Sequence, residues 1–192
     1  MNGPTPVRVA IVTFDGFNEL DSFIALGLLS RLRPAGWTVE IAGPSQRLTS
    51  MNGVTIEAQQ PLEFANEADI VLFGSGIYTR AIAENSALLD RLQLDPVRQL
   101  IGAQCSGTLL LARLGLLADI PACTDLTTKP WVVEAGVRVV DAPFHARPDR
   151  DGRWLHGVAV PGHLGDAAAR RAGGHCEGAA LRGAGRRERG LR

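Results

Sequence analysis

The sequence predicts a three-layer α/β sandwich built on a mostly parallel sheet. Short β-branched or apolar segments alternate along the chain with segments that carry apolar residues at helical spacing. The chain has 192 residues, of which 45% are hydrophobic, and this suits one domain with one core. Alternating strands and helices favour a parallel sheet covered on both faces, with the ligand site beyond the carboxyl ends of the strands.

The first part of the chain has the pattern of a strand, a loop, a helix and a second strand. The β-branched segment Val7–Thr13 predicts the first strand. Leu20–Leu32 carries apolar residues at helical spacing, and Pro34 and Gly36 end that helix. Thr38–Ala42 predicts the second strand. This order of elements fits the first unit of a parallel sheet.

The middle of the chain continues the alternation. Leu48–Ile56 predicts a hairpin that turns at Asn52-Gly53, a pair of residues typical of tight turns. Ile70–Phe73 predicts a buried strand, which ends in the small residues Gly74-Ser75-Gly76. A helix is expected over Ala87–Gln93.

The next segments complete the expected sheet. Leu100–Ala103 predicts a strand, Ser106–Leu114 a helix, and Val137–Val140 a further strand after a helical or irregular stretch at Trp131–Ala135. Because the carboxyl ends of parallel strands lie at one edge of a sheet, we expect three loops to meet there. They are residues 15–21, 74–78 and 104–107.

Composition narrows the class of protein. The longest apolar runs, such as Thr108–Ala112, fall far short of the ~20 residues that a membrane span needs, so no membrane partner is expected. The N-terminal residues do not have the pattern of a signal peptide, which favours a cytoplasmic protein. The cysteines Cys105, Cys123 and Cys176 are odd in number and match no zinc spacing. We therefore expect free thiols, no metal and no cofactor, and no nucleic-acid partner.

Cys105 is the candidate nucleophile. It lies between a short strand and an apolar helix, with small residues on both sides, which predicts a sharp and strained elbow. The start of the following helix is expected to lower the pKa of the thiol. The N–H groups of Ser106 and of Gly74–Gly76 are candidates for an oxyanion or substrate-binding pocket. The alternative is a small buried cysteine with only a structural role, as we expect for Cys123.

Several of these segments resemble the signature stretches of the ThiJ/PfpI superfamily. They are Phe14–Asp21, Gly74-Ser75-Gly76, and Cys105-Ser106-Gly107 with the apolar run to Gly115-Leu116-Leu117. They occur in the family's order, and the resemblance covers residues 7–146. It implies a flavodoxin-like sandwich of the class I glutamine amidotransferase type, a small-molecule substrate and a homodimer.

The resemblance also implies roles for particular residues. In that family an acidic residue of the first loop reaches the elbow cysteine, which implies Asp21 here, with Glu19 as the second candidate. Many members have a histidine where this chain has Asp125, which argues against peptidase or amidotransferase chemistry that depends on an imidazole. Asp125 is then an accessory residue of the site. Isonitrile-hydratase-like members resemble the chain more closely. Their proposed chemistry needs only the elbow cysteine and the first-loop aspartate, which are Cys105 and Asp21 here.

Other functions remain open at this point. Glyoxalase or deglycase chemistry is a second enzymatic hypothesis. A ligand-binding or regulatory module of the same fold is the third, although no helix-turn-helix follows this domain. A redox-sensing module, in which Cys105 is oxidised, is the fourth.

The last part of the sequence, residues 147–192, differs from residues 1–146. It consists mostly of Arg, Gly and Ala, and the family's final strand and helix have no counterpart there. Shifted by one base, the codons of Trp154–Gly162 and of Leu181–Glu188 permit residues that resemble the family's missing elements. We therefore hypothesise that the reading frame slips near Ala146 or Arg147. The alternative is a native, disordered tail.

Overall fold

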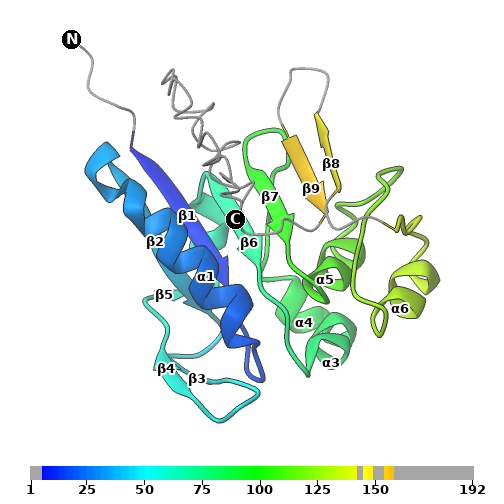
Figure 1. Cartoon of the computed structure of the whole chain (residues 1–192), viewed down its shortest axis with the longest axis horizontal. Coiled ribbons are helices and arrows are strands. Elements are labelled where there is room, and N and C mark those ends of the chain that lie inside the picture. Colours follow the sequence, from blue (N-terminus) through cyan, green and yellow to red (C-terminus); the bar gives the residue numbers. More distant parts are fainter. Residues whose placement is uncertain (1–5, 142–144, 149–153, 158–192) are drawn as a thin grey trace, which may run out of the picture.

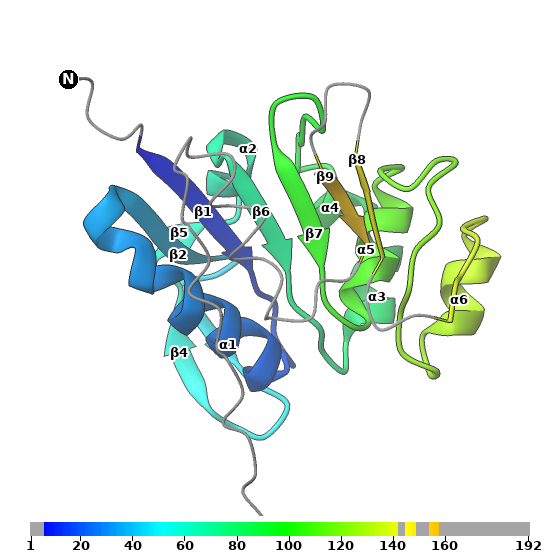
Figure 2. The same ribbon diagram turned by 45° about the horizontal axis from the view of Figure 1, so that its top comes forward.

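The computed structural model describes residues 6–141, 145–148 and 154–157 (Figures 1 and 2). Its centre is a five-stranded sheet in the order β5-β2-β1-β6-β7, in which all neighbouring strands are parallel. This confirms the predicted parallel sheet. The strands are β1 Val7–Val12, β2 Trp37–Gly43, β5 Gln60–Pro61, β6 Ile70–Phe73 and β7 Leu100–Ala103.

β6 and β7 carry no polar side chain and β1 is apolar from Val9 to Val12, as expected for strands that are covered on both faces of the sheet. Val9 of β1 pairs with Val39 of β2 on one side and with Ile70 of β6 on the other. All four residues of β6 and of β7 are buried. The parallel register brings the carboxyl ends of β1, β6 and β7 to the same edge, where the elbow lies.

Helices cover the two faces unequally (Figure 1). α1, Glu19–Leu29, continues as the 3₁₀ helix η1, Ser30–Ala35, and packs through Ala25 and Leu29 on one face. The opposite face is covered by the remaining helices. They are α2 Phe64–Glu67, α3 Thr79–Glu84, α4 Ser86–Leu89, α5 Gly107–Arg113 and α6 Lys129–Glu134. The resulting three layers confirm the α/β sandwich of flavodoxin type.

The predicted hairpin is present and rests against the first loop. It is formed by β3, Arg47–Thr49, and β4, Thr55–Glu57, which pair antiparallel. The N–H of Gly16 donates to the carbonyl of Thr49 at 2.7 Å, and the N–H of Met51 donates to the carbonyl of Phe17 at 2.9 Å. The hairpin therefore supports the loop that leads into α1.

Some elements differ from the prediction. The helix expected over Ala87–Gln93 is only the single turn of α4, and the short helices α2 and α3 were not expected. The strand expected at Val137–Val140 is reduced to one bridge between Ala122 and Val139. The ladder does not extend to Ile120, because the N–H of that residue donates to the carbonyl of Leu117 instead.

Two further strands follow residue 144. β8, His145–Pro148, and β9, Trp154–Gly157, pair antiparallel, and β9 lies beside β7 (Figures 1 and 2). The predicted domain boundary at residue 146 falls within β8, and most of the tail after it, including Cys176, lies outside the described residues. Within the described ranges no helix is long and apolar enough to cross a membrane.

Candidate active site

Cys105 occupies a strained turn between β7 and α5. Its φ of 49° lies in the left-handed region, which non-glycine residues adopt rarely. A Cβ on Gly107 would lie 2.6 Å from the carbonyl oxygen of Gly74, so only glycine fits where the chain turns into α5. The hydroxyl of Thr124 donates to the carbonyl of Cys105 at 3.0 Å and fixes the turn from the opposite side. The predicted elbow is therefore present.

Asp125 contacts the cysteine directly. The Cys105 thiol donates to Asp125 Oδ2 at 3.3 Å. The other carboxylate oxygen, Oδ1, accepts the N–H groups of Thr127 and Thr128, each at 2.9 Å. Two backbone donors thus hold the Asp125 carboxylate against the sulfur. The sequence analysis had given Asp125 only an accessory role.

Asp21 faces the same region from the first turn of α1. Its carboxylate Oδ2 accepts a hydrogen bond from the Ser75 hydroxyl. Its main-chain carbonyl accepts from the Gln104 side-chain amide at 3.1 Å, so the residue before the cysteine is tied to the first loop. The three loops expected to converge therefore do meet. Asp21 is the first-loop acid that lies in this cluster.

Glu19 points away from the cluster and binds the hairpin. Its carboxylate accepts from the Ser50 hydroxyl and, at 2.9 Å, from the Asn52 side-chain amide. The hydrogen bond from Ser50 is the main cause of the lowered pKa of Glu19. Glu19 thus anchors the loop that carries Asp21, and the structure does not bring it to the cysteine.

The electrostatics of Cys105 are the reverse of the expectation. Burial and then the negative charge of Asp125 raise the pKa of the thiol to about 11, although a hydrogen bond from the Ser106 N–H lowers it. The prediction of a lowered pKa was wrong because burial and a carboxylate in direct contact together outweigh the dipole of a helix of seven residues. At neutral pH Cys105 is a neutral thiol.

The two carboxyl groups near Cys105 have pKa values that are shifted in opposite directions. Burial raises the pKa of Asp21, against the effect of the hydrogen bonds from Ser75. Burial also raises the pKa of Asp125, but the hydrogen bonds from Thr128, Cys105 and Thr127 together lower it below its ordinary value. The two shifts differ in sign because burial is the larger effect at Asp21, whereas the hydrogen bonds together outweigh burial at Asp125.

The N–H groups predicted to form an oxyanion pocket already have acceptors. The N–H of Gly74 donates to the carbonyl of Val12 at 3.2 Å, and that of Ser75 donates to the Asp21 carboxylate. The N–H of Gly76 donates to Ser106 Oγ at 3.3 Å. In this structure the three amides therefore position the loop and Asp21, and their part in binding an oxyanion or a substrate stays a prediction.

Ser106 has a structural role in the elbow. Its hydroxyl lies 2.9 Å from the Thr79 hydroxyl, and the two together join the start of α5 to the start of α3. The sequence analysis missed Thr79, as it missed Thr124 and Thr128. An aspartate that accepts from N–H groups two and three residues later is a local pattern, and it could have indicated how Thr127 and Thr128 hold Asp125.

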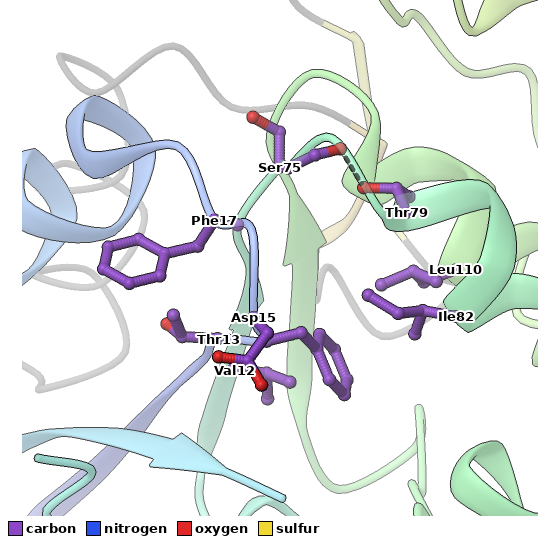
Figure 3. Close-up of a pocket in the computed structure, with 11 residues that line it drawn as sticks. Val12, Thr13, Asp15, Phe17, Ser75, Thr79, Ile82 and Leu110 are labelled. Atoms are coloured by element: carbon purple, nitrogen blue, oxygen red, sulfur yellow. Dashed lines mark hydrogen bonds between the residues drawn. The ribbon is translucent and has the colours of Figure 1, made fainter. Parts of the chain in front are cut away.

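A small cavity lies beside the Gly74–Gly76 loop. Figure 3 shows side chains of Asp15, Phe17, Ser75 and Thr79 around it, with Leu110 and Ile82 closing one side. Its volume of about 10 Å³ is room for about one water molecule. Cys105 does not line it, so this cavity supports the loop and is not the place of a substrate.

Comparison with known proteins gives the family. Residues 7–159 match the DJ-1/PfpI family. No curated protein matches the chain significantly. Among similar solved structures is a two-domain protein of Anabaena variabilis with DJ-1/ThiJ/PfpI-like and ferritin-like domains, at 20% identity and a TM-score of 0.70. The match covers 87% of this chain and 48% of that protein, so the chain spans about half its length.

Two other structures match over most of both chains. DJ-1β of Drosophila melanogaster is 22% identical with a TM-score of 0.65, covering 88% of this chain and 89% of that one. An AraC family transcriptional regulator of Pseudomonas putida is 19% identical with a TM-score of 0.63, covering 88% and 94%. The elbow cysteine, the fold and the match over residues 7–159 lead to one conclusion: the chain belongs to the DJ-1/PfpI family.

Proposed function

We propose that the chain is a thiol-dependent hydratase that converts a small isonitrile into the N-substituted formamide. The observation that carries the proposal is the contact of Cys105 Sγ with Asp125 Oδ2 at 3.3 Å. A second carboxyl, Asp21, has a raised pKa and lies in the same cluster. A nucleophile with a proton acceptor on one side and a proton donor nearby suits the addition of water to an isonitrile.

The first step joins the sulfur to the substrate. Cys105 Sγ attacks the terminal carbon of R–N≡C, and its proton passes to the Asp125 carboxylate that already accepts it. The protonated Asp21 carboxyl gives its proton to the same carbon. The product is a thioimidate, R–N=CH–S–Cys105, with Asp21 ionised and Asp125 protonated. The C≡N triple bond has become a double bond, and one C–S bond and one C–H bond have formed.

The second step adds water and releases the product. The water oxygen bonds to the thioimidate carbon, and one proton of that water passes to Asp21. Asp125 gives its own proton to the nitrogen. The resulting R–NH–CH(OH)–S–Cys105 collapses, the C–S bond breaks, and the hydroxyl proton returns to sulfur. The net reaction is R–N≡C plus water to R–NH–CHO, and all three residues regain their starting protonation states.

The protonation state of the cysteine favours this reaction over redox sensing. With a pKa of about 11, only about one Cys105 in 10⁴ is a thiolate at pH 7. Peroxide oxidises thiolates, so reversible oxidation would be slow here. Isonitrile hydration uses both the sulfur and the proton of a neutral thiol. Addition of a thiol to an aldehyde has the same property, so glyoxalase or deglycase chemistry is the alternative enzyme activity.

A ligand-binding module is the second candidate function. It is favoured by the likeness to the Pseudomonas putida AraC family regulator, of which the match covers 94%. In such a module the cysteine and the two carboxyls would bind a small molecule without turnover. Stoichiometric binding without product distinguishes this role from the hydratase.

The experiment that tests the hydratase uses cyclohexyl isonitrile as the probe, with formamide measured by gas chromatography and mass spectrometry. We expect formamide from the wild-type chain and none above background from Cys105→Ser. Cys123→Ser is the matched control, because Cys123 is buried and has no role in the mechanism. Intact-protein mass should show a thioimidate adduct on the wild type. Equal formamide from the wild type and Cys105→Ser would overturn the proposal.

We also propose that the chain is a homodimer. Leu20, Ile24 and Leu28 lie four residues apart on α1 and are exposed, at 65%, 39% and 39%. The helix is uncharged from Ser22 to Ser30, and a helix that is apolar all round is usually covered on all sides. Two antiparallel copies of α1 would bury this row and bring the acidic first turn of one copy near the exposed Arg31 of the other.

A further inference from the structure

The cysteine site is surrounded by negative charge. Asp21 and Asp125 flank Cys105, and both act to raise the pKa of its thiol. Glu19 lies on the same turn as Asp21. Over the residues that the structure describes, no ion pair joins any of these three carboxylates to a Lys or Arg. Their hydrogen-bond donors are hydroxyls, amides and the thiol, which leave the charge in place.

The cations on the helices beside the elbow are bound elsewhere. Lys129 at the start of α6 pairs with Asp141 at 3.4 Å. Arg80 of α3 pairs with Glu84 at 3.2 Å, and its guanidinium lies 5.0 Å from the ring centre of Trp131. Among the described residues, neither Lys129 nor Arg80 is therefore available at the site to bind a carboxylate or a phosphate.

The loops that carry the site also present apolar side chains to solvent. Leu126 directly follows Asp125 and is 83% exposed. Tyr78 directly precedes Thr79, which contacts Ser106, and it is 53% exposed. Single exposed apolar side chains are ordinary, but these two lie on loops of the site and so offer an uncharged substituent an apolar surface.

From these charges and side chains we infer that the site accepts uncharged molecules with an apolar substituent and rejects anions. As a statement about substrates this rests on the proposed hydratase activity. The physical cause is independent of that activity, because an anion that approaches the sulfur meets the Asp125 carboxylate in contact with it, in a partly buried site. Carboxylate-bearing or phosphorylated small molecules are thereby excluded as substrates.

The test compares two alkylating agents of nearly equal size, iodoacetamide and iodoacetate, which are neutral and anionic. Each forms a C–S bond to Cys105 and releases iodide, and the rates are followed at pH 9 by peptide mass spectrometry. N-acetylcysteine amide gives the ratio of the two rates for an unshielded thiol. We expect the ratio for Cys105 to exceed that reference at least about tenfold in favour of iodoacetamide.

Two variants show whether the carboxylates cause the selectivity. Asp125→Asn should bring the ratio of rates toward the reference, whatever it does to the absolute rates. Glu67→Gln is the matched control, since it also removes one negative charge. Glu67 pairs with Arg8 at the start of β1, whereas the cysteine site lies at the opposite, carboxyl end of the strands. A wild-type ratio within about twofold of the reference would overturn the inference, and this outcome needs no variant to fold.

A second arm separates this inference from the hydratase proposal. Methyl isocyanoacetate and isocyanoacetate are supplied as a neutral and an anionic isonitrile, and formamide is measured for each. Turnover of the ester alone supports both proposals, and equal turnover of the two overturns the inference. If neither is converted while the alkylation ratio is high, the hydratase fails and the charge selectivity stands.

Discussion

The Cys105 thiol donates a hydrogen bond to Asp125 Oδ2 at 3.3 Å. The two residues are twenty positions apart in the sequence and meet because the turn after β7 and the segment before α6 lie side by side. The contact places a negative charge beside the sulfur and, together with burial, it explains why this cysteine is a neutral thiol in a fold that presents it at a helix start.

Removal of that charge should lower the pKa of the thiol. In Asp125→Asn we expect the pH midpoint of Cys105 alkylation to fall from about 11 by at least ~1 unit, because both the Coulombic effect and the hydrogen bond to the carboxylate are lost. Peptide mass spectrometry across pH 7 to 12 measures this. Asp141→Asn is the control with the same change of charge. An unchanged midpoint in Asp125→Asn would show that burial alone sets the pKa.

Asp21 should control the pH dependence of turnover. The mechanism needs Asp21 protonated, so activity is expected below the raised pKa of this carboxyl and is lost as the pH rises through it. Asp21→Asn should lower kcat by about 10² to 10⁴. The pH profile of cyclohexyl isonitrile hydration measures both effects. If Asp21→Asn keeps the wild-type rate and pH profile, Asp21 is not the proton donor.

Gly107 should be essential for the elbow. In Gly107→Ala the new methyl group would lie 2.6 Å from the carbonyl oxygen of Gly74, and we expect a loss of about 1 to 3 kcal/mol in the free energy of unfolding. Gly27→Ala is the matched change within α1, where nothing lies within 4 Å, and it should be neutral or stabilising. Urea denaturation compares the two. Equal stability of both variants would mean that the elbow can shift to accept a Cβ.

The exposed row on α1 should determine the oligomeric state. We expect a dimer in sedimentation velocity, and Ile24→Glu should give a monomer because it places a charge in the middle of the row. Val97→Glu, at an exposed site in the loop before β7, is the control and should leave the dimer intact. A wild-type chain that sediments as a monomer would contradict the proposal.

The frame hypothesis makes a prediction about the gene. Resequencing should find a one-base change near the codons of Ala146 and Arg147 that restores the family's usual final elements. The family match itself extends to residue 159, which is beyond that point. An intact reading frame through codon 192 would contradict the hypothesis.

The sequence by itself determined the fold and the position of the elbow cysteine. Buried parallel strands need unbroken apolar runs, so Val7–Thr13, Ile70–Phe73 and Leu100–Ala103 identified β1, β6 and β7 from local pattern alone. The elbow was equally local, because the small residues around Cys105 permit the turn and mark its place. Val137–Val140 was predicted as a strand but forms only an isolated bridge at Val139. A β-branched run does not reveal whether a partner strand with free N–H groups lies beside it.

Only the tertiary structure decided how the site works. Glu19 and Asp21 are two residues apart and of similar chemistry. Only the packing determined that Glu19 binds the hairpin and Asp21 binds Ser75. The sign of the Cys105 pKa shift depends on burial and on the distance to Asp125, and both are set by segments far apart in the chain. Sequence patterns record neighbours along the chain, whereas desolvation and Coulomb energy depend on neighbours in space.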